Sequence, residues 1–374
     1  MSYQTYRKKR RKNPAIGWIA AVLAVLTVCC AYAGRINPND FFLAPFMALA
    51  YMPMLFITLV AVVVLLFCSR RWALVLIVAL MATIPVFKMF VPLNTDENRP
   101  TPPVDTTAVV KVMTYNVLGF NYNEPDLSAK PSESIRLILE ANPDVVLLQE
   151  GGAGGHHWLD LPSVVPFQQE IKKRYPYYYN SADGLNIMSK YPFTTLPLGA
   201  RLQSRSPLGY NRDQTSHLAR AYDLQLPSGK QLRLVDFRLQ SYHLSFAKGM
   251  NVRVSPDVKP SPLERMRRSF SLRGSNAETL RRLLDASPAN LIVCGDMNDV
   301  TDSHVYRTIR GDDLNDAWCD VGLGYANTYN RHGLKYRIDH VLYRGAVRPF
   351  EAVRIKGGSS DHYPLMVSFD LDIN

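Results

Sequence analysis

Three apolar segments in the first quarter of the chain constrain its fold more than any other feature. They cover residues 15–33, 45–67 and 72–90. A helix of about 20 apolar residues crosses the hydrocarbon core of a bilayer, and each segment is long enough to do so. The third is the least apolar, because it contains Pro85 and Lys88. The sequence therefore predicts a membrane anchor over residues 1–92 with three transmembrane helices.

Basic residues beside these segments predict how the anchor is oriented. The sequence RKKRRK occupies positions 7–12, and Arg70 and Arg71 lie between the second and third segments. Positively charged loops remain on the cytoplasmic side of a membrane. Both clusters satisfy this rule when the N-terminus is cytoplasmic and the chain beyond residue 92 is extracytoplasmic, in the periplasm or outside. AYAG at 31–34 resembles a signal-peptidase site, although cleavage there would not change the final location.

A polar, proline-rich segment at 93–108 follows the anchor and is typical of an extended linker. A soluble domain is therefore expected over residues 109–374. Residues 1–100 hold 11 basic and 3 acidic side chains, a net charge of +8 out of the total of +11. The remaining 32 basic and 29 acidic residues give only +3. The basic character of the chain therefore belongs mostly to the anchor and does not indicate a nucleic-acid-binding domain.

The five cysteines do not indicate a structural metal site. None of them lies in a CxxC pair or in a cysteine and histidine cluster with zinc spacing. Cys294 lies in an apolar run and is expected to behave as a small hydrophobic residue. A disulfide between Cys294 and Cys319 remains an open alternative at this point.

The sequence of the soluble domain predicts more strands than helices. Expected strands are 109–116, 144–149, 185–188, 221–226, 231–239, 290–294, 337–343 and 365–371, and expected helices are 132–141 and 276–284. Several strands are wholly apolar, as when helices cover the outer face of a sheet. Polar residues follow these strands, and Asn116, Glu150, Asp296 and Asn298 are examples. We expect these side chains to meet along one edge of the sheets, where sites are often built.

Five short motifs supply an oxygen-rich set of side chains. They are TYN at 114–116, LLQE at 147–150, GDMND at 295–299, RID at 337–339 and SDH at 360–362. A single acidic residue at a strand end is more often a cap or a surface ion pair than a ligand. Carboxylates and amides together suit Mg²⁺ or Mn²⁺ better than Zn²⁺. Such ions, with water among their ligands, are the usual partners of phosphate chemistry.

The order of LLQE, GDMND and SDHYP closely resembles the endonuclease/exonuclease/phosphatase superfamily, over residues 112–369. The resemblance implies an α/β (α+β) fold of two packed, mostly antiparallel β-sheets flanked by helices, a four-layer sandwich with the site at one end. It also implies a Mg²⁺- or Mn²⁺-dependent phosphoesterase. The closer likeness to nuclease and sphingomyelinase branches favours phosphodiester substrates, either nucleic acid or phospholipid. The sequence indicates no particular protein partner.

The resemblance also assigns roles at a metal. Glu150 would be the main ligand, and Asn116 would bind beside it. Asp361 would support the metal ion or its water shell, although a role as a turn residue is the alternative.

Four further residues would act on the phosphate and the attacking water. Asp296 would orient or deprotonate the water, and Asn298 would position Asp296 and the phosphate. His362 would contact the phosphoryl oxygens, and Asp339 would fix its ring. His340, next to Asp339, is expected to pack inside the strand.

One strand departs from the family pattern. Where many members carry a histidine at the end of a strand, VDFRLQSYHL at 235–244 has Arg238. Arginine does not release its proton, but it can bind phosphate through two hydrogen bonds and stabilise developing charge. Three alternatives stay open: His243 enters the site, the protein is a catalytically impaired binding or scaffold protein, or Arg238 merely pairs with Asp236 on the strand.

A basic run lies in the predicted helical region. It comprises 265–268 together with Arg273, Arg281 and Arg282. We expect a solvated helix face, with contact to phosphate or lipid headgroups as the alternative.

Overall fold

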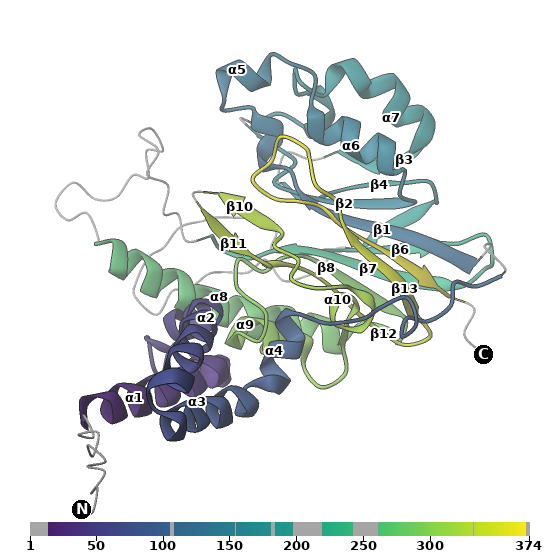
Figure 1. Cartoon of the computed structure of the whole chain (residues 1–374). Helices are drawn as coiled ribbons and strands as arrows, with labels where there is room; N and C mark the ends of the chain where they lie inside the picture. The colour runs from purple at the N-terminus through teal and green to yellow at the C-terminus, as the bar shows by residue number, and fades with distance from the viewer. Residues whose placement is uncertain are drawn as a thin grey trace, which may run out of the picture. The chain divides into compact units, whose positions relative to one another are not determined.

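The computed structural model describes residues 14–104, 108–153, 155–180, 184–196, 219–241, 261–331 and 333–371. It divides into two compact units (Figure 1). The first comprises Met1–Ala33 and Phe46–Val86, and the second comprises Gly34–Pro45 and Phe87–Asn374. The connection between the first two apolar helices thus belongs to the same unit as the C-terminal part of the chain.

Apolar helices make up the first unit. They are α1 (Pro14–Tyr32), α2 (Ala44–Cys68), α3 (Arg70–Ala82) and α4 (Ile84–Phe90), of which α2 begins and α4 ends within the second unit. Two of them, α1 and α2, are long and apolar enough to cross a membrane, and α3 with α4 forms a pair bent by 58° that would make a third crossing if it acts as one span. Gly17 of α1 lies against the ring of Trp72, where a Cβ atom would come within 2.5 Å of the indole. Thr27 and Thr58 share a hydroxyl hydrogen bond of 2.7 Å between α1 and α2. Small residues and hydroxyl pairs of this kind hold helices together in lipid.

Two six-stranded sheets form the second unit. Their strand orders are β13-β14-β1-β2-β4-β3 and β5-β6-β7-β8-β12-β9, with a separate hairpin of β10 and β11. The bounds are β1 (Val109–Asn116), β2 (Val145–Gln149), β3 (Tyr177–Tyr179), β4 (Asn186–Ser189), β5 (Phe193–Leu196), β6 (Ala219–Gln225), β7 (Gln231–Arg238), β8 (Leu291–Asp296), β9 (Asn315–Asp316), β10 (Tyr329–Arg331), β11 (Leu334–Tyr336), β12 (Asp339–Arg344), β13 (Arg348–Arg354) and β14 (Leu365–Asp370). Only β1 with β2 and β7 with β8 pair in parallel among the described strands. The predicted fold class is therefore confirmed.

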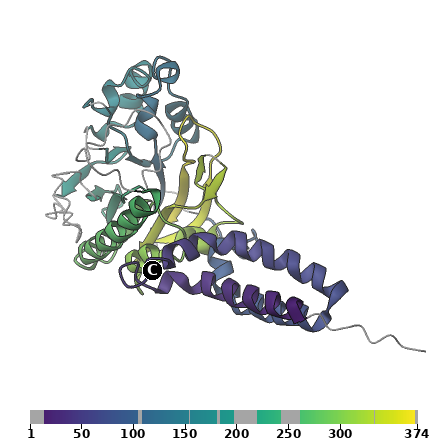
Figure 2. The same ribbon diagram turned by 90° about the vertical axis from the view of Figure 1, so that its left-hand side faces the viewer.

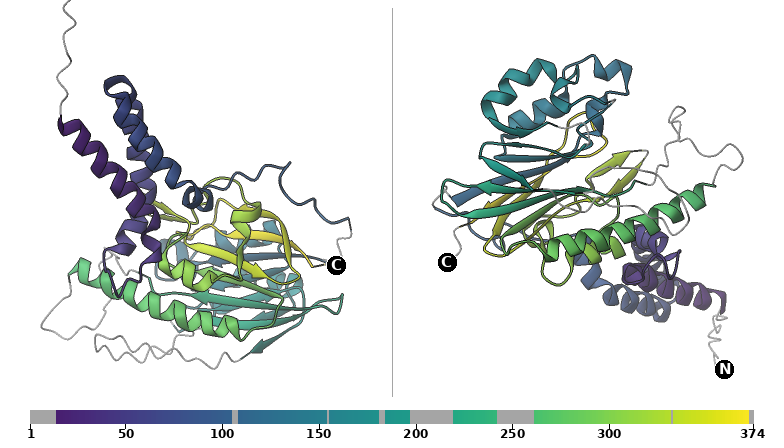
Figure 3. Two further views of the ribbon diagram at one scale, coloured as in Figure 1. Left: turned by 90° about the horizontal axis from the view of Figure 1, so that it is seen from below. Right: turned by 180° about the vertical axis from the view of Figure 1, so that it is seen from behind.

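A shared hydrophobic core lies between the sheets, and helices cover their outer faces. Val112 and Leu147 of the first sheet belong to one buried cluster with Leu234 and Ile292 of the second. The outer layers are α6 (Glu133–Ala141) and α7 (Gln168–Arg174) on the first sheet, and α8 (Pro262–Asp285) and α9 (His304–Arg310) on the second (Figure 3). Shorter elements are α5 (Pro125–Ser128) and α10 (Ala317–Val321), with 3₁₀ turns at Leu118–Asn121, Trp158–Asp160 and Val165–Phe167.

Helix α8, green in Figure 2, is longer than the sequence pattern predicts. It begins where the hydroxyl of Ser261 accepts a hydrogen bond from the amide of Glu264, 14 residues before the predicted start at 276. The buried stripe of the first half carries polar residues, so apolar periodicity does not reveal it. The expectation of a wholly solvated basic face is wrong for Arg273. Its side chain is fully buried and lies 3.6 Å from the carboxylate of Asp299.

A buried polar network joins the edge of the second sheet to α9 and α10. The Asp316 carboxylate caps α10 and accepts hydrogen bonds from Arg337 at 2.8 Å and from the Tyr306 hydroxyl at 2.9 Å. Burial opposes ionisation, but Arg337 outweighs it and holds the pKa of Asp316 well below its usual value. His340 is fully buried beside this network, as predicted for a residue packed in the strand.

Replacing Asp316 by alanine is expected to lower the free energy of unfolding by about 3–5 kcal/mol, because Arg337 would be left buried without its partner. The pKa of Asp316 is depressed, so its contribution is present above the usual pKa of about 3.9 and is lost as the pH falls below that value. Thermal unfolding of the detergent-solubilised chain between about pH 5 and pH 3 measures both effects. Asp313→Ala removes an exposed partner of Arg344 and should cost less than about 1 kcal/mol. Equal losses in the two variants would contradict the assignment.

Neither Cys294 nor Cys319 forms a disulfide in the described part of the chain. Cys294 is buried in β8 between the sheets, whereas the Cys319 thiol lies 3.4 Å from the carbonyl oxygen of Met89. The open alternative of a bond between them therefore has no place in this structure.

The segments that flank the apolar helices belong to the second unit. Asn94 donates hydrogen bonds to the carbonyl oxygens of Cys319 and Gly322 at 2.9 and 3.0 Å, so the start of the predicted linker is held against α10. In the earlier connection, Gly34 touches the backbone of Asp302 so closely that a Cβ atom would lie 1.7 Å from its carbonyl oxygen. Only glycine fits at this position.

Candidate active site

The ends of five strands bring the predicted polar residues to one edge of the two sheets. Asn116 ends β1, and Glu150 directly follows β2, its parallel neighbour. In the other sheet, Asp296 at the end of β8 is in register with Arg238 of β7 on one side and with Asp339 of β12 on the other. The register of the sheets, rather than proximity in sequence, therefore sets the spacing of these side chains.

Asn116 connects the two sheets at this edge. Its side-chain amide donates to Oε1 of Glu150 at 2.9 Å and to Oδ2 of Asp296 at 3.0 Å, and it is buried. Its carbonyl oxygen accepts from the amide of Leu118 at 3.1 Å, which fixes the orientation of the group. Asn116 therefore holds two carboxylates, one from each sheet, in a set position.

Asp296 is fully buried, and its carboxylate accepts three hydrogen bonds. Oδ1 accepts from the backbone amide of Asn298 at 2.7 Å, and Oδ2 accepts from the side-chain amides of Asn298 and Asn116. Burial raises the pKa of Asp296 to about 7, and the Asp339 carboxylate adds to the rise while His362 opposes it. A carboxylate with a pKa near neutrality can accept a proton from water at working pH.

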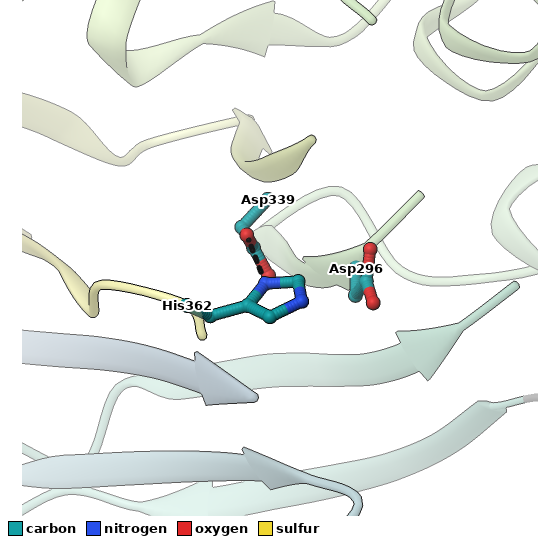
Figure 4. Close-up of side chains that lie close together, drawn as sticks. All are labelled: Asp296, Asp339 and His362. Atoms are coloured by element: carbon teal, nitrogen blue, oxygen red, sulfur yellow. Dashed lines mark hydrogen bonds and ion pairs between the residues drawn. The ribbon is translucent and has the colours of Figure 1, made fainter. Parts of the chain in front are cut away.

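Asp339 and His362 form the second element of the site (Figure 4). The ring Nδ1 of His362 lies 2.8 Å from Oδ2 of Asp339, and the other ring nitrogen faces Asp296. Burial alone would lower the pKa of His362, but Asp339 outweighs it and raises the pKa to about 10. The imidazole is therefore protonated at neutral pH, with Nδ1–H donating to Asp339 and Nε2–H left to donate into the site.

Arg238 pairs with Glu150 across the two sheets. Its guanidinium lies 2.7 Å from Oε1 of Glu150, the oxygen that also accepts from Asn116. Burial opposes ionisation of Glu150, but Arg238 outweighs it, and the pKa of Glu150 is held below its usual value. The alternative of a pair with Asp236 on the same strand is wrong, because the Asp236 carboxylate instead accepts from the amide of Gln149. His243, the other alternative, lies outside the described residues.

Asp361 lies beside the site and pairs with Arg331. Its Oδ2 accepts from Arg331 at 3.3 Å. Its other oxygen and Oδ1 of Asp339 have no hydrogen-bond partner among the residues that the structure describes. Buried carboxylate oxygens without a donor are costly and are normally satisfied by a cation or water.

The donor set fits a hard divalent cation. One ligand atom from each of Asp296, Asp339 and His362 lies within 4.8 Å of the others, so a buried acidic cluster exists. The oxygen donors at this edge are the carboxylates of Asp296 and Asp339, with that of Glu150 beside them. Oxygen ligands match Mg²⁺ or Mn²⁺ rather than Zn²⁺.

Backbone conformation also marks the site. Glu150 and Asn298 both have positive φ angles, 54° and 49°, which non-glycine residues rarely adopt. The cost is of the order of 1–3 kcal/mol per residue, and such strain is concentrated at functional sites. Glu150 directly follows β2, and Asn298 lies two residues after the end of β8.

Sequence reasoning missed three supporting residues. Ser360 accepts from the amide of His362 at 3.1 Å and donates to the carbonyl oxygen of Asn116 at 2.7 Å. Thr328 accepts from the amide of Asp339 at 3.0 Å, and the Tyr329 ring packs edge-on against His362 at 5.3 Å between centroids. The position of Ser360 beside His362 is a signal that could have found it, whereas Thr328 and Tyr329 lie in a segment without a motif.

Several solved structures are similar to parts of this chain. The structure of humanized D. rerio TDP2 has 16% sequence identity and a TM-score of 0.45, covering 70% of this chain and 99% of that one. Sphingomyelinase C from Streptomyces griseocarneus has 18% identity and a TM-score of 0.43, covering 72% and 99%. The human Nocturnin catalytic domain has 16% identity and a TM-score of 0.43, covering 74% and 98%. No curated protein sequence matches the chain.

Family models cover both parts of the chain. Residues 13–90 match a domain of unknown function, DUF8431. Residues 113–362, which include every site residue described above, match the model of the Endonuclease/Exonuclease/phosphatase family. With its paired sheets and with Asn116, Glu150, Asp296 and His362 at one edge, the chain belongs to the Endonuclease/Exonuclease/phosphatase family.

Proposed function

We propose that the protein is a membrane-anchored, Mg²⁺-dependent (or Mn²⁺-dependent) hydrolase of phosphodiester bonds. Members of the family are hydrolases that act on phosphoester bonds and generally use a divalent metal ion. The observation that carries the proposal is the position of Asp296. It is held by Asn116 and Asn298, has a pKa near neutrality, and lies between the Glu150 carboxylate and protonated His362.

The residues divide the work of phosphodiester hydrolysis. Glu150, with Asn116 beside it, would hold the cation, which would neutralise phosphate charge. Asp296 accepts the proton of the attacking water. The hydrogen bonds from Asn298 keep the Asp296 carboxylate in the orientation that this transfer requires. His362 donates Nε2–H to a phosphoryl oxygen, and Asp339 keeps that histidine charged and oriented.

Arg238 takes part of the role that a histidine has in many relatives. It cannot supply a proton to the leaving group, but its guanidinium is charged at every working pH and is one-third exposed. A phosphate entering beside Glu150 would meet this group, which can donate two hydrogen bonds to phosphoryl oxygens.

Phospholipid is the favoured phosphodiester, with nucleic acid as the alternative. Gly34 lies two residues after Tyr32, the last residue of α1, and touches Asp302, four residues after Asn298. Four residues reach at most about 14 Å, so the connection that follows α1 lies close to Asn298. Headgroup phosphates are the phosphodiesters nearest to such a site.

Metal-dependent turnover tests the proposal. The full chain, purified in detergent, is expected to hydrolyse bis(p-nitrophenyl) phosphate with Mg²⁺ and to stop when EDTA is added. A panel of DNA, RNA, sphingomyelin and phosphatidyl lipids then identifies the substrate. If no member of the panel and no generic diester turns over with Mg²⁺ or Mn²⁺, the alternative holds, and the protein is a binding or scaffold protein. The ion pair between Arg238 and Glu150, which occupies the expected metal ligand, is the observation that favours this alternative.

The same contacts support a three-span anchor. Residues 34–45 follow α1, and they fold in one unit with the domain that follows α4. They must therefore lie on the same side of the membrane as that domain. The chain between them crosses once through α2, so a return requires a second crossing through α3 and α4. With the cytoplasmic N-terminus that the basic residues predict, we expect the catalytic domain outside the cytoplasm.

Reporter fusions test the orientation. Alkaline phosphatase, which is active only outside the cytoplasm, is expected to be active when fused after residue 105 and inactive when fused after residue 69. A cytoplasm-only fluorescent reporter should give the reverse pattern at the two positions. Fluorescence after residue 105 would overturn the orientation.

A further inference from the structure

The connection between α1 and α2 lies along one stripe of helix α8. Ser271 donates a hydrogen bond of 2.6 Å to the side-chain oxygen of Asn39. One turn earlier, the Arg267 guanidinium lies 5.7 Å from the centre of the Phe42 ring. One turn later, Gly274 lies next to Pro38. A Cβ atom added to Gly274 would be 3.4 Å from the ring of Pro38. Positions 267, 271 and 274 share a helix face, so the contact is continuous along α8.

Chain connectivity fixes how far this stripe is from the membrane. Phe42 lies two residues before Ala44, the first residue of α2. Two residues reach at most about 7 Å. The headgroup layer on each side of the hydrocarbon core is about 5–7 Å thick. Arg267, in contact with Phe42, therefore lies within or next to the headgroup layer of the membrane that α2 enters.

The exposed side chains here suit a lipid surface. Large apolar residues that are 38–55% exposed are Ile36, Phe41, Phe42, Leu43 and Leu263. Arg265 and Arg267 are exposed beside them, while Glu264 is neutralised by Arg268 at 2.8 Å. Aromatic and aliphatic groups that enter the boundary between headgroups and acyl chains, with arginines at the level of the phosphates, are typical of interfacial segments.

We infer that residues 36–43 and the first half of α8 form a binding surface for the headgroups of anionic phospholipids in the bilayer that anchors the chain. Arg265 and Arg267 bind the lipid phosphates, and Phe41, Leu43 and Leu263 enter the interface. The inference rests on the proposed membrane anchoring, but not on the proposed chemistry. It gives the catalytic domain a fixed face toward the membrane.

Spin-label accessibility tests the surface. A nitroxide is attached at Leu263→Cys in the full chain, with Cys29, Cys68 and Cys319 replaced by serine, in nanodiscs of phosphatidylcholine with phosphatidylglycerol. Collisions with oxygen, which concentrates in the bilayer, are compared with collisions with a water-soluble nickel chelate. The matched control is Val165→Cys, where the side chain is 50% exposed against 55% for Leu263 and lies in the helical layer of the other sheet.

A several-fold higher ratio of oxygen to nickel collisions is expected at position 263 than at position 165. Equal ratios in a chain that resists alkaline extraction would overturn the inference and leave the anchoring intact. Release of the chain by alkaline extraction would instead refute the anchoring on which it rests.

Charge reversal tests the role of the arginines. In the same labelled chain, the ratio should rise when phosphatidylglycerol is added to pure phosphatidylcholine. Arg265→Glu with Arg267→Glu should abolish this rise. Lys172→Glu with Lys173→Glu, the same change in charge on exposed residues of α7, should leave it unchanged. An undiminished response in the arginine variant would show that the surface does not recognise anionic lipid.

Discussion

Alanine at position 296 is expected to reduce metal-dependent phosphodiester hydrolysis by about 10³-fold. A positioned general base contributes about 10²–10⁴-fold, and loss of the carboxylate also removes the acceptor that Asn298 and Asn116 share. The measurement is kcat and KM for bis(p-nitrophenyl) phosphate at saturating Mg²⁺. The fall should appear in kcat, since the water is activated after the substrate has bound.

Asp296→Asn is the matched variant, because it keeps the size of the buried side chain and one acceptor oxygen. It should lose activity to a similar degree while unfolding at nearly the temperature of the original chain. If the asparagine variant folds and turns over at the original rate, another group activates the water. A fall in activity that accompanies loss of the thermal transition would report folding only, and the asparagine variant separates the two.

Arg238 is expected to have the second largest effect on turnover. Arg238→Ala should lower kcat/KM by about 10²-fold, because one charge-assisted, two-point contact to the phosphate is lost. Arg238→Lys keeps the charge but not the planar pair of donors, and should recover only part of the activity. Arg238→His restores the residue type that many relatives carry, and should recover more than lysine if proton transfer to the leaving group matters.

Metal titration gives a second, independent readout for Arg238. Its guanidinium is 2.7 Å from the Glu150 oxygen that would face the cation, so arginine and metal compete for one carboxylate. Removing the guanidinium should therefore lower the Mg²⁺ concentration needed for half-maximal binding, although turnover falls. If the alanine variant turns over as fast as the original chain, Arg238 is outside the mechanism, and His243 becomes the residue to test.

Strand-end motifs were enough to predict which polar side chains lie together. Asn116, Glu150 and Asp296 each follow an apolar run, and the ends of such strands do meet in the structure. The partner of Arg238 was not predictable in this way. Period-two spacing offered Asp236 on the same strand as one alternative, whereas the partner in the structure, Glu150, belongs to the other sheet. How two sheets pack face to face depends on side-chain volumes across the core, which local spacing does not encode.

Strand β13 and the first half of α8 were not predicted from the sequence, because each mixes polar and apolar residues. Strand β13 alternates between charged and apolar residues without a buried run, and the first half of α8 buries Ser269, Phe270 and Arg273 rather than an aliphatic stripe. Burial of Arg273 depends on Asp299, which is distant in sequence and reaches it only in the folded domain. Residues 34–45 gave no signal beyond that of a short connection, because their contacts are also with residues far along the chain.

Strand β14 makes closure of the first sheet depend on the C-terminal part of the chain. Although it is the last of the described strands, it lies inside the first sheet, paired with β1 on one side and β13 on the other. His362 precedes it by only three residues. The first sheet and the site therefore cannot close until the segment that contains His362 and β14 has joined β1 and β13. Folding of this sheet thus depends on pairing between residues that are far apart in sequence, which slows folding.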